Sequence, residues 1–133
     1  MINLKKAIAD SIMTNPIIYA LVGDRVYRKR NDKNANPPFI VYECSGFENK
    51  LGKYQNNHWY QGNKLVVDIV GEYMYEDQLD EIADALITQR WWFVGELTNT
   101  WSGTIAFEGR DEGYDPVTDY SVVRLFFLFK HTY

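Results

Sequence analysis

Leu65–Ile87 reads LVVDIVGEYMYEDQLDEIADALI and joins two different periodicities. The first six residues are rich in β-branched side chains that alternate between two sides, as side chains do along a strand. After Gly71 and Glu72, apolar side chains recur at the spacing of a helix, at Leu79, Ile82, Ala83, Leu86 and Ile87. We therefore predict a long strand over 58–70 that leads into a helix over 75–87, with the helix packed on a sheet.

The outer face of this predicted helix is acidic. Its carboxylates are Asp77, Asp80, Glu81 and Asp84. Three of them, at positions i, i+4 and i+7, have a spacing that could hold a divalent cation. Because the sequence specifies no further ligand beside them, we interpret the face as solvated and expect no metal.

Further elements on both sides complete the predicted domain. Asn3 is placed to cap a helix over Leu4–Met13, and Pro16 favours its end just before. The apolar run over 17–22 is interpreted as one more helical turn. Strands are predicted over 25–28, 39–44, 100–110 and 120–130, with a turn over 111–116 and a strand or buried corner at 91–94.

The last predicted strand is apolar on both faces. One face carries Ser121, Val123, Leu125, Phe127 and Phe129, and the other carries Tyr120, Val122, Arg124, Phe126 and Leu128. Such a strand is either central and covered on both sides, or covered on one side by a partner chain.

The composition indicates one small domain. A chain of 133 residues is long enough to bury a core without a metal or a disulfide. Aromatic residues make up 16% of it, which is more than one small core needs. Because Tyr and Trp are enriched where protein surfaces meet, the excess indicates either association with other chains or a tyrosine-rich sheet face.

No pattern in the sequence points to catalysis or to a cofactor. Cys44 is the sole cysteine, which excludes an intramolecular disulfide, and we interpret it as a small buried residue. His58 and His131 lie far apart and are interpreted as surface residues. Nucleophile elbows and phosphate-binding loops are absent from the sequence. The sequence also lacks the apolar region of a signal peptide and a run long enough to span a membrane. We therefore expect synthesis in a reducing cytoplasm.

Charge is unevenly distributed along the chain, whose net charge is −4. Residues 1–64 hold ten Lys and Arg against five Asp and Glu, whereas residues 65–115 hold two against twelve. This split reflects either two solvated faces or a basic edge that meets an acidic edge of the next copy in a ring. The basic cluster is Arg25, Arg28, Lys29, Arg30 and Lys33; weak, sequence-independent contact with nucleic acid is a minor alternative.

Residues 46–57 lack clean periodicity and are interpreted as a long loop or hairpin arm. Phe47, Leu51 and Tyr54 are the large apolar side chains within it. They favour a docking surface over an unstructured loop, so we expect this arm to reach a partner chain.

The order of these elements resembles the tail completion or tail terminator proteins of long-tailed bacteriophages. The similarity covers nearly the whole chain and rests on order and spacing. It is carried by the short first helix, by the segment from Asn15 to Tyr27 with its proline, apolar run, glycine and Arg-Val-Tyr, and by the proline-led strand over 37–43. The variable arm, the long strand, the acidic helix over 75–87 and the closing strand over 120–129 follow.

This resemblance implies an α+β fold, with a mainly antiparallel β-sheet packed against two α-helices and a long loop or hairpin arm. It implies a virion protein that forms a hexameric ring, caps the tail tube, ends its polymerisation and forms the tail side of the head–tail joint. Its partners would be the tail tube protein and the head–tail connector or neck protein, with phage DNA passing through the lumen without sequence-specific binding. Catalysis, cofactors and membranes play no part.

Two other functions stay open at this point. A head-completion or neck adaptor protein of the same particle has a similar size and layout. A small-molecule-binding α+β domain, or an enzyme of unknown chemistry, is the alternative from a different class. As the candidate interface we name Arg25, Arg28 and Arg30 of one copy against Asp77, Asp80, Glu81 and Asp84 of the next.

Overall fold

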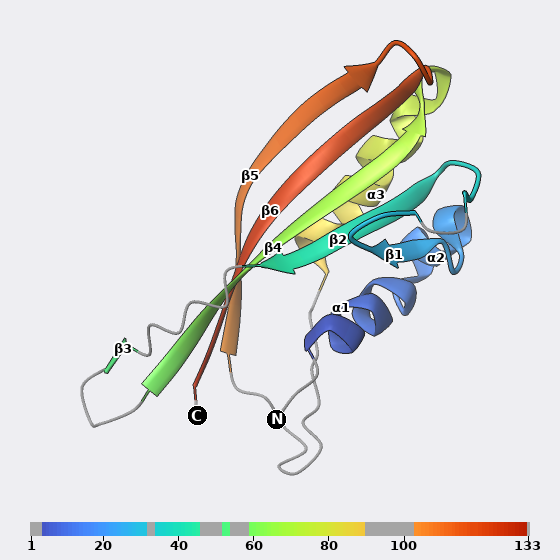
Figure 1. Cartoon of the computed structure of the whole chain (residues 1–133). Helices are drawn as coiled ribbons and strands as arrows, with labels where there is room; N and C mark the ends of the chain where they lie inside the picture. The colour runs from blue at the N-terminus through green and yellow to red at the C-terminus, as the bar shows by residue number, and fades with distance from the viewer. Residues whose placement is uncertain (1–3, 32–33, 46–51, 54–58, 90–102, 133) are drawn as a thin grey trace.

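The computed structural model describes residues 4–31, 34–45, 52–53, 59–89 and 103–132. Figure 1 shows how its elements follow one another along the chain. They are α1 (Leu4–Met13), α2 (Pro16–Val22), β1 (Val26–Arg28), β2 (Phe39–Ser45), β3 (Gly52–Lys53), β4 (Trp59–Glu72), the 3-10 turn η2 (Tyr73–Tyr75), α3 (Glu76–Thr88), β5 (Gly103–Asp115) and β6 (Tyr120–Thr132).

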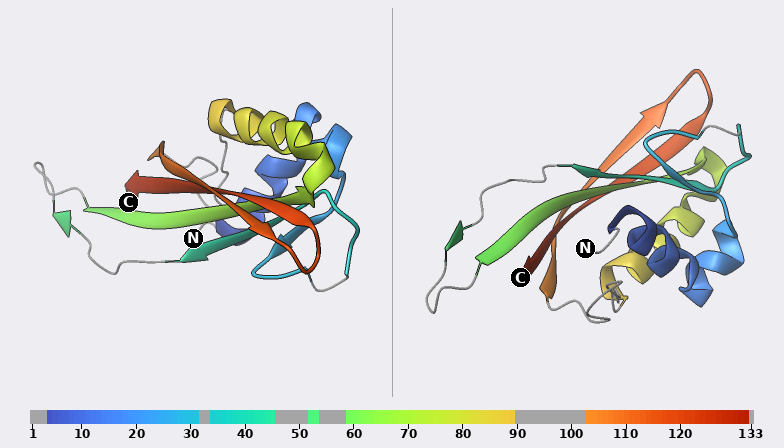
Figure 2. Two further views of the ribbon diagram at one scale, coloured as in Figure 1. Left: turned by 90° about the horizontal axis from the view of Figure 1, so that it is seen from above. Right: turned by 60° about the horizontal axis from the view of Figure 1, so that its bottom comes forward.

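The strands form a single sheet in the order β1-β2-β4-β6-β5, with the short β3 paired to the beginning of β4. β1 lies parallel to β2, and every other pair is antiparallel. The predicted α+β class with a mainly antiparallel sheet is therefore confirmed. Figure 2 shows the twist of the sheet, which carries β5 and β6 across β4 at an angle. β1 and β5 are its two edges.

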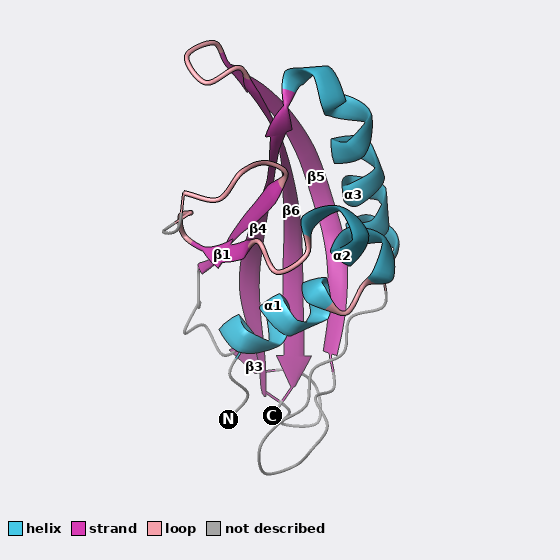
Figure 3. Ribbon diagram, turned by 90° about the vertical axis from the view of Figure 1, so that its right-hand side faces the viewer, coloured by secondary structure: helices cyan, strands magenta, loops and turns pink. Residues whose placement is uncertain are grey.

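The three helices lie on one face of the sheet (Figure 3). The alternation predicted for the long strand is observed, because Leu65, Val67 and Ile69 are fully buried beneath the helices. On the helix side, the predicted stripe supplies Leu79, Ile82 and Leu86. The core also takes in Ile8, Ile12, Ile18, Val22, Ile40, Val123, Leu125 and Phe127. Burial of these side chains is the main source of stability.

The structure differs from the sequence-based prediction in two places. α2 is a full third helix where we expected one helical turn, because Asn15 caps it and Pro16 occupies its first position. The turn predicted over 111–116 is wrong, since β5 continues to Asp115 and the chain turns at 116–119. The glycines and aspartates of 109–115 that resemble a turn are tolerated there because β5 is an edge strand.

Within the part of the chain that the structure describes, helices cover one face of the closing strand. Ser121, Val123, Leu125 and Phe127 point toward the helices and are buried. On the opposite face Val122, Phe126 and Leu128 are half-buried and Arg124 is exposed. Coverage of both faces by this chain is therefore not observed among the described residues, and coverage of the other face by a partner chain stays a prediction.

Gly71 pairs with Ser121 beneath the start of α3 and leaves no room for a side chain. A Cβ at this position would lie 2.5 Å from Cδ2 of Leu79, a side chain that is itself buried in the core. We expect Gly71→Ala to lower the free energy of unfolding by about 1–3 kcal/mol, measured by urea denaturation. Gly113→Ala is the matched control, because nothing lies within 4 Å of its added Cβ. Equal losses for the two variants would contradict the close packing of α3 on β4.

Candidate assembly surfaces

The face of the sheet that the helices do not cover, which we call the open face, carries an ion pair among apolar side chains. Asp68 of β4 and Arg124 of β6 are direct partners in the antiparallel register. Arg124 donates from Nε to Oδ1 of Asp68 at 2.7 Å and from Nη2 to Oδ2 at 3.0 Å. The hydrogen bond to Asp68 raises the pKa of Arg124 above its ordinary value. This two-bond fork pairs the two charges, and half-buried Val66, Val122 and Phe126 lie on the same face beside it.

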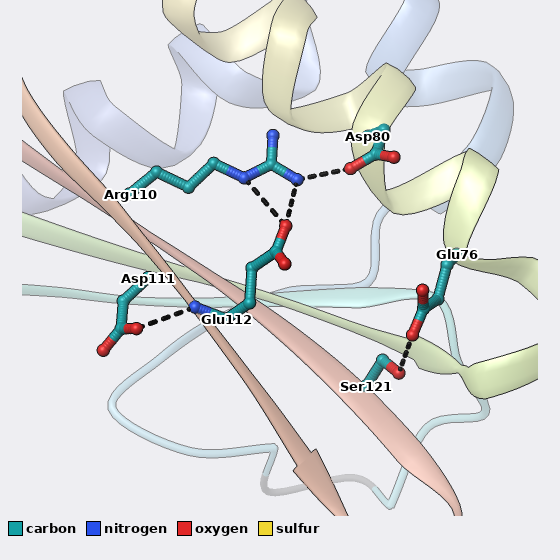
Figure 4. A network of polar contacts seen from close by, with 6 residues as sticks. All are labelled: Glu76, Asp80, Arg110, Asp111, Glu112 and Ser121. Atoms are coloured by element: carbon teal, nitrogen blue, oxygen red, sulfur yellow. Dashed lines mark hydrogen bonds and ion pairs between the residues drawn. The ribbon is translucent and has the colours of Figure 1, made fainter.

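The acidic helix is tied to the edge strand β5 by a network of polar contacts (Figure 4). Arg110 of β5 pairs with Asp80 of α3 and with Glu112 of its own strand, the latter at 2.7 Å between Nη2 and Oε1. The hydrogen bond to Asp80 is the main cause of a raised pKa at Arg110. Ser121 donates to Oε1 of Glu76 at 2.8 Å in the same region. Asp80 is thus engaged within its own chain.

The other three predicted helix carboxylates, Asp77, Glu81 and Asp84, are exposed on α3. The structure therefore separates the predicted acidic set into one residue that binds β5 and three that face solvent. Sequence reasoning missed Arg110, because its pairing with Asp80 joins residues 30 positions apart.

The predicted basic cluster is likewise divided. Arg25 turns toward the chain itself and donates to the carbonyl oxygens of Pro38 and Leu21, each at 3.0 Å. It thereby ties the end of α2 to the start of β2. Arg28, Lys29 and Arg30 stand exposed where β1 ends, and we call these three residues the basic corner. Lys33 lies outside the described residues.

A group of exposed apolar side chains lies at the end of the molecule where β4 passes into α3. Figure 1 shows this end at the top, where the start of α3 meets the turn between β5 and β6. Its members, which we call the aromatic tip, are Tyr73, Met74, Tyr75, Tyr114 and Val117. The Tyr-Met-Tyr run is visible in the sequence, but the sequence analysis assigns it no surface role.

Several predicted residues fall outside the described part of the chain. Phe47, Leu51 and Tyr54 of the arm are among them, and so is His58. Gly52 and Lys53 form β3 and pair with Tyr60 and Trp59 of β4. The segment 91–94, predicted as a strand or a corner, also lies outside.

The described residues show no group of three or more His, Cys, Asp and Glu side chains placed to hold a metal ion. Within the same part of the chain, the helices are all too short or too polar to cross a membrane. Cys44 is half-buried near the end of β2. Tyr42, two residues earlier in the same strand, belongs to the hydrophobic core. Its burial raises the pKa of its hydroxyl.

Comparison with known proteins establishes the fold. A scan against models of protein families finds no match, and a search of curated proteins finds none either. Among solved structures, a chain described as "Virion of native gene transfer agent (GTA) particle" is similar, with a TM-score of 0.64 and 10% sequence identity. The similarity covers 98% of this chain and 98% of that chain. The two chains therefore share one fold almost from end to end.

Proposed function

We propose that this chain is a structural protein of a phage-like virion and that it acts there as the tail terminator. The observation that carries the proposal is the fold shared over 98% of both chains with a protein of the gene transfer agent virion. The order of elements that resembles phage tail terminators supports the same conclusion. The location would be the tail or neck region of the particle, reached after assembly in the host bacterial cytoplasm.

The mechanism is geometric and needs no catalysis or cofactor. Copies of the chain form a ring, expected to be hexameric, that matches the tail tube on one face and the connector or neck protein on the other. A ring in this place denies the growing end of the tube to further tube subunits. Phage DNA passes through the lumen without sequence-specific binding, because the chain is acidic overall and repels phosphates.

The contacts between copies are proposed from the distribution of charge. The exposed Arg28 and Arg30 of one copy face the exposed Asp77, Glu81 and Asp84 of the next, and Asp80 contributes after its internal pairing with Arg110. Arg25 contributes indirectly, because its hydrogen bonds to the carbonyls of Leu21 and Pro38 hold the chain just before β1 in place. Phe47, Leu51 and Tyr54 of the arm remain proposed contacts to a neighbouring copy or to the tube.

The test of this function is the growth of tail tubes in the presence of the chain. Tube subunits from the same particle are allowed to polymerise, and tube length is followed by light scattering and electron microscopy. Substoichiometric chain is expected to stop growth and shorten the tubes. Unchanged tube length would contradict the proposal. Binding to the connector without binding to the tube would instead assign the chain to the neck.

The charge arrangement makes a separate prediction. Reversal of the basic corner by Arg28→Glu with Arg30→Glu is expected to weaken ring formation, and more so at low salt than at high salt, because screening shortens the reach of exposed charges. Sedimentation of rings at several salt concentrations measures the effect. Lys64→Glu, at an exposed position of β4, is the control for charge reversal outside the basic corner and is compared with the single variant Arg28→Glu. A loss that does not depend on salt would reject the proposed role of charge.

A further inference from the structure

The aromatic tip exposes several large apolar side chains to solvent at one end of the molecule. Met74 is 74% exposed and Val117 is 91% exposed, and each of the three tyrosines is at least half exposed. Single exposed apolar residues are ordinary, but a contiguous group of them marks a surface that another molecule covers.

The tip is also held in one arrangement. Tyr114 donates from its hydroxyl to Oδ1 of Asp119 at 2.6 Å, and the backbone N–H of Tyr73 donates to the carbonyl of Asp119 at 3.1 Å. The rings of Tyr73 and Tyr114 meet edge to face at a centroid distance of 5.4 Å. In the adjacent turn, the N–H of Val117 donates to Oδ1 of Asp115 at 2.9 Å. A surface that is fixed before binding loses little entropy on binding, as is typical of the dominant contacts in an interface.

The surroundings of the tip restrict the chemistry of its partner. The segments 72–77 and 111–119 that form it contain carboxylates and no Lys or Arg. These carboxylates are Glu72, Glu76, Asp77, Asp111, Glu112, Asp115 and Asp119. Two described cations adjoin these segments, and both are already paired: Arg110 with Asp80 and Glu112, and Arg124, opposite Asp111 in the register, with Asp68. A fitting partner therefore brings positive charge together with apolar surface.

A second copy of this chain carries such a surface. The basic corner lies at the β1 edge, whereas the tip includes the end of β5 at the opposite edge of the same sheet. Half-buried Val26 and Tyr27 lie on β1 itself, directly before Arg28, and supply apolar surface beside the corner. Guanidinium groups pack well on tyrosine rings, and the acidic rim adds attraction to the basic corner.

We propose that the aromatic tip of one copy docks on the basic corner of the next. The contact joins two different surfaces of the same chain, so it is head-to-tail and can close into a ring. This inference rests on the proposed ring function and supplies the apolar contact that exposed charges alone do not provide. The tip then contributes most of the affinity, and the carboxylates of α3 set the register.

Cross-linking between two single-cysteine variants tests the contact. In a Cys44→Ser background, a Val117→Cys copy is mixed with a Lys29→Cys copy under mild oxidation. We expect several-fold more disulfide-linked heterodimer than from a control mixture of Lys64→Cys with Lys29→Cys, because Lys64 is exposed on β4 and belongs to neither proposed contact. Adding Val117→Arg to an otherwise unmodified chain is expected to reduce ring formation, since it places a cation opposite the basic corner.

Each outcome separates this inference from the proposed function. Cross-linking at the control level, in a chain that still stops tube growth, would overturn the docking of the tip on a second copy and leave the function standing. Strong cross-linking in a chain that leaves tube growth unchanged would sustain the docking and reject the function. Linkage of Val117→Cys to the tube protein in place of the Lys29→Cys copy would also overturn the inference.

Discussion

Replacing Phe127 by alanine is expected to lower the free energy of unfolding by about 3–5 kcal/mol. The Phe127 side chain is 2% exposed and faces the helices from β6. Its ring lies 5.7 Å from that of Phe107 on the neighbouring edge strand. Removing the ring takes away its transfer free energy and leaves a cavity that the surrounding aliphatic side chains fill only in part. Urea denaturation followed by tryptophan fluorescence measures the loss.

Phe126→Ala is the matched control, because it removes the same ring from the next residue of the same strand. Phe126 points to the open face, opposite Val66 in the register, and is only half-buried. We expect Phe126→Ala to lower the free energy of unfolding of the isolated chain by about 1–2 kcal/mol, since folding removes less of the Phe126 side chain from water. Similar losses for Phe126 and Phe127 would mean that both faces of the sheet are covered equally, contrary to the structure.

Asn15→Ala is expected to lower the free energy of unfolding by about 2 kcal/mol, because it removes a helix cap and a bridge together. Oδ1 of Asn15 accepts a hydrogen bond from the N–H of Ile17 at the start of α2. Its Nδ2 donates to the carbonyl of Ala85 at 3.3 Å and to Oε1 of Gln89 at 3.0 Å. One side chain therefore fixes α2 against the end of α3.

Asn15→Asp separates these two contributions. The aspartate keeps an acceptor for the N–H of Ile17 but has no donor for the oxygens of Ala85 and Gln89. We expect its stability, measured by the same denaturation experiment, to lie between those of the alanine variant and the unmodified chain. If Asn15→Asp is as stable as the unmodified chain, the hydrogen bonds to α3 contribute nothing. If Asn15→Asp is only as stable as Asn15→Ala, the cap of α2 contributes nothing.

The predictable parts of the fold are those with strong local periodicity. The alternation over Leu65–Val70 and the stripe from Leu79 to Ile87 each repeat often enough to identify one element and its buried side. The strand at Phe39 is predictable for a different local reason, because β-branched and aromatic residues follow two prolines there. The two faces of β6 could be assigned from sequence, but which face the helices cover depends on contacts with α3 and could not.

The remaining features depend on residues that are distant in the sequence. The place of β1 beside β2, in parallel, follows from a crossover that no local pattern specifies. The pairing of Asp80 with Arg110 removes one carboxylate from the solvated face of α3. From the sequence alone, each of these two residues is interpreted as solvated. The aromatic tip forms only when the turn at 116–119 folds against Tyr73, so its exposed tyrosines could not be recognised as one surface.

The position of the chain on assembled tail tubes tests the central claim most directly. A gold-labelled chain is added to tubes assembled without a terminator, and negative-stain electron microscopy locates the label. We expect a single cluster of label at one end of each tube, with a ring visible there in end-on views. Label distributed along the tube wall, or tubes whose ends carry no label at saturating chain, would contradict it.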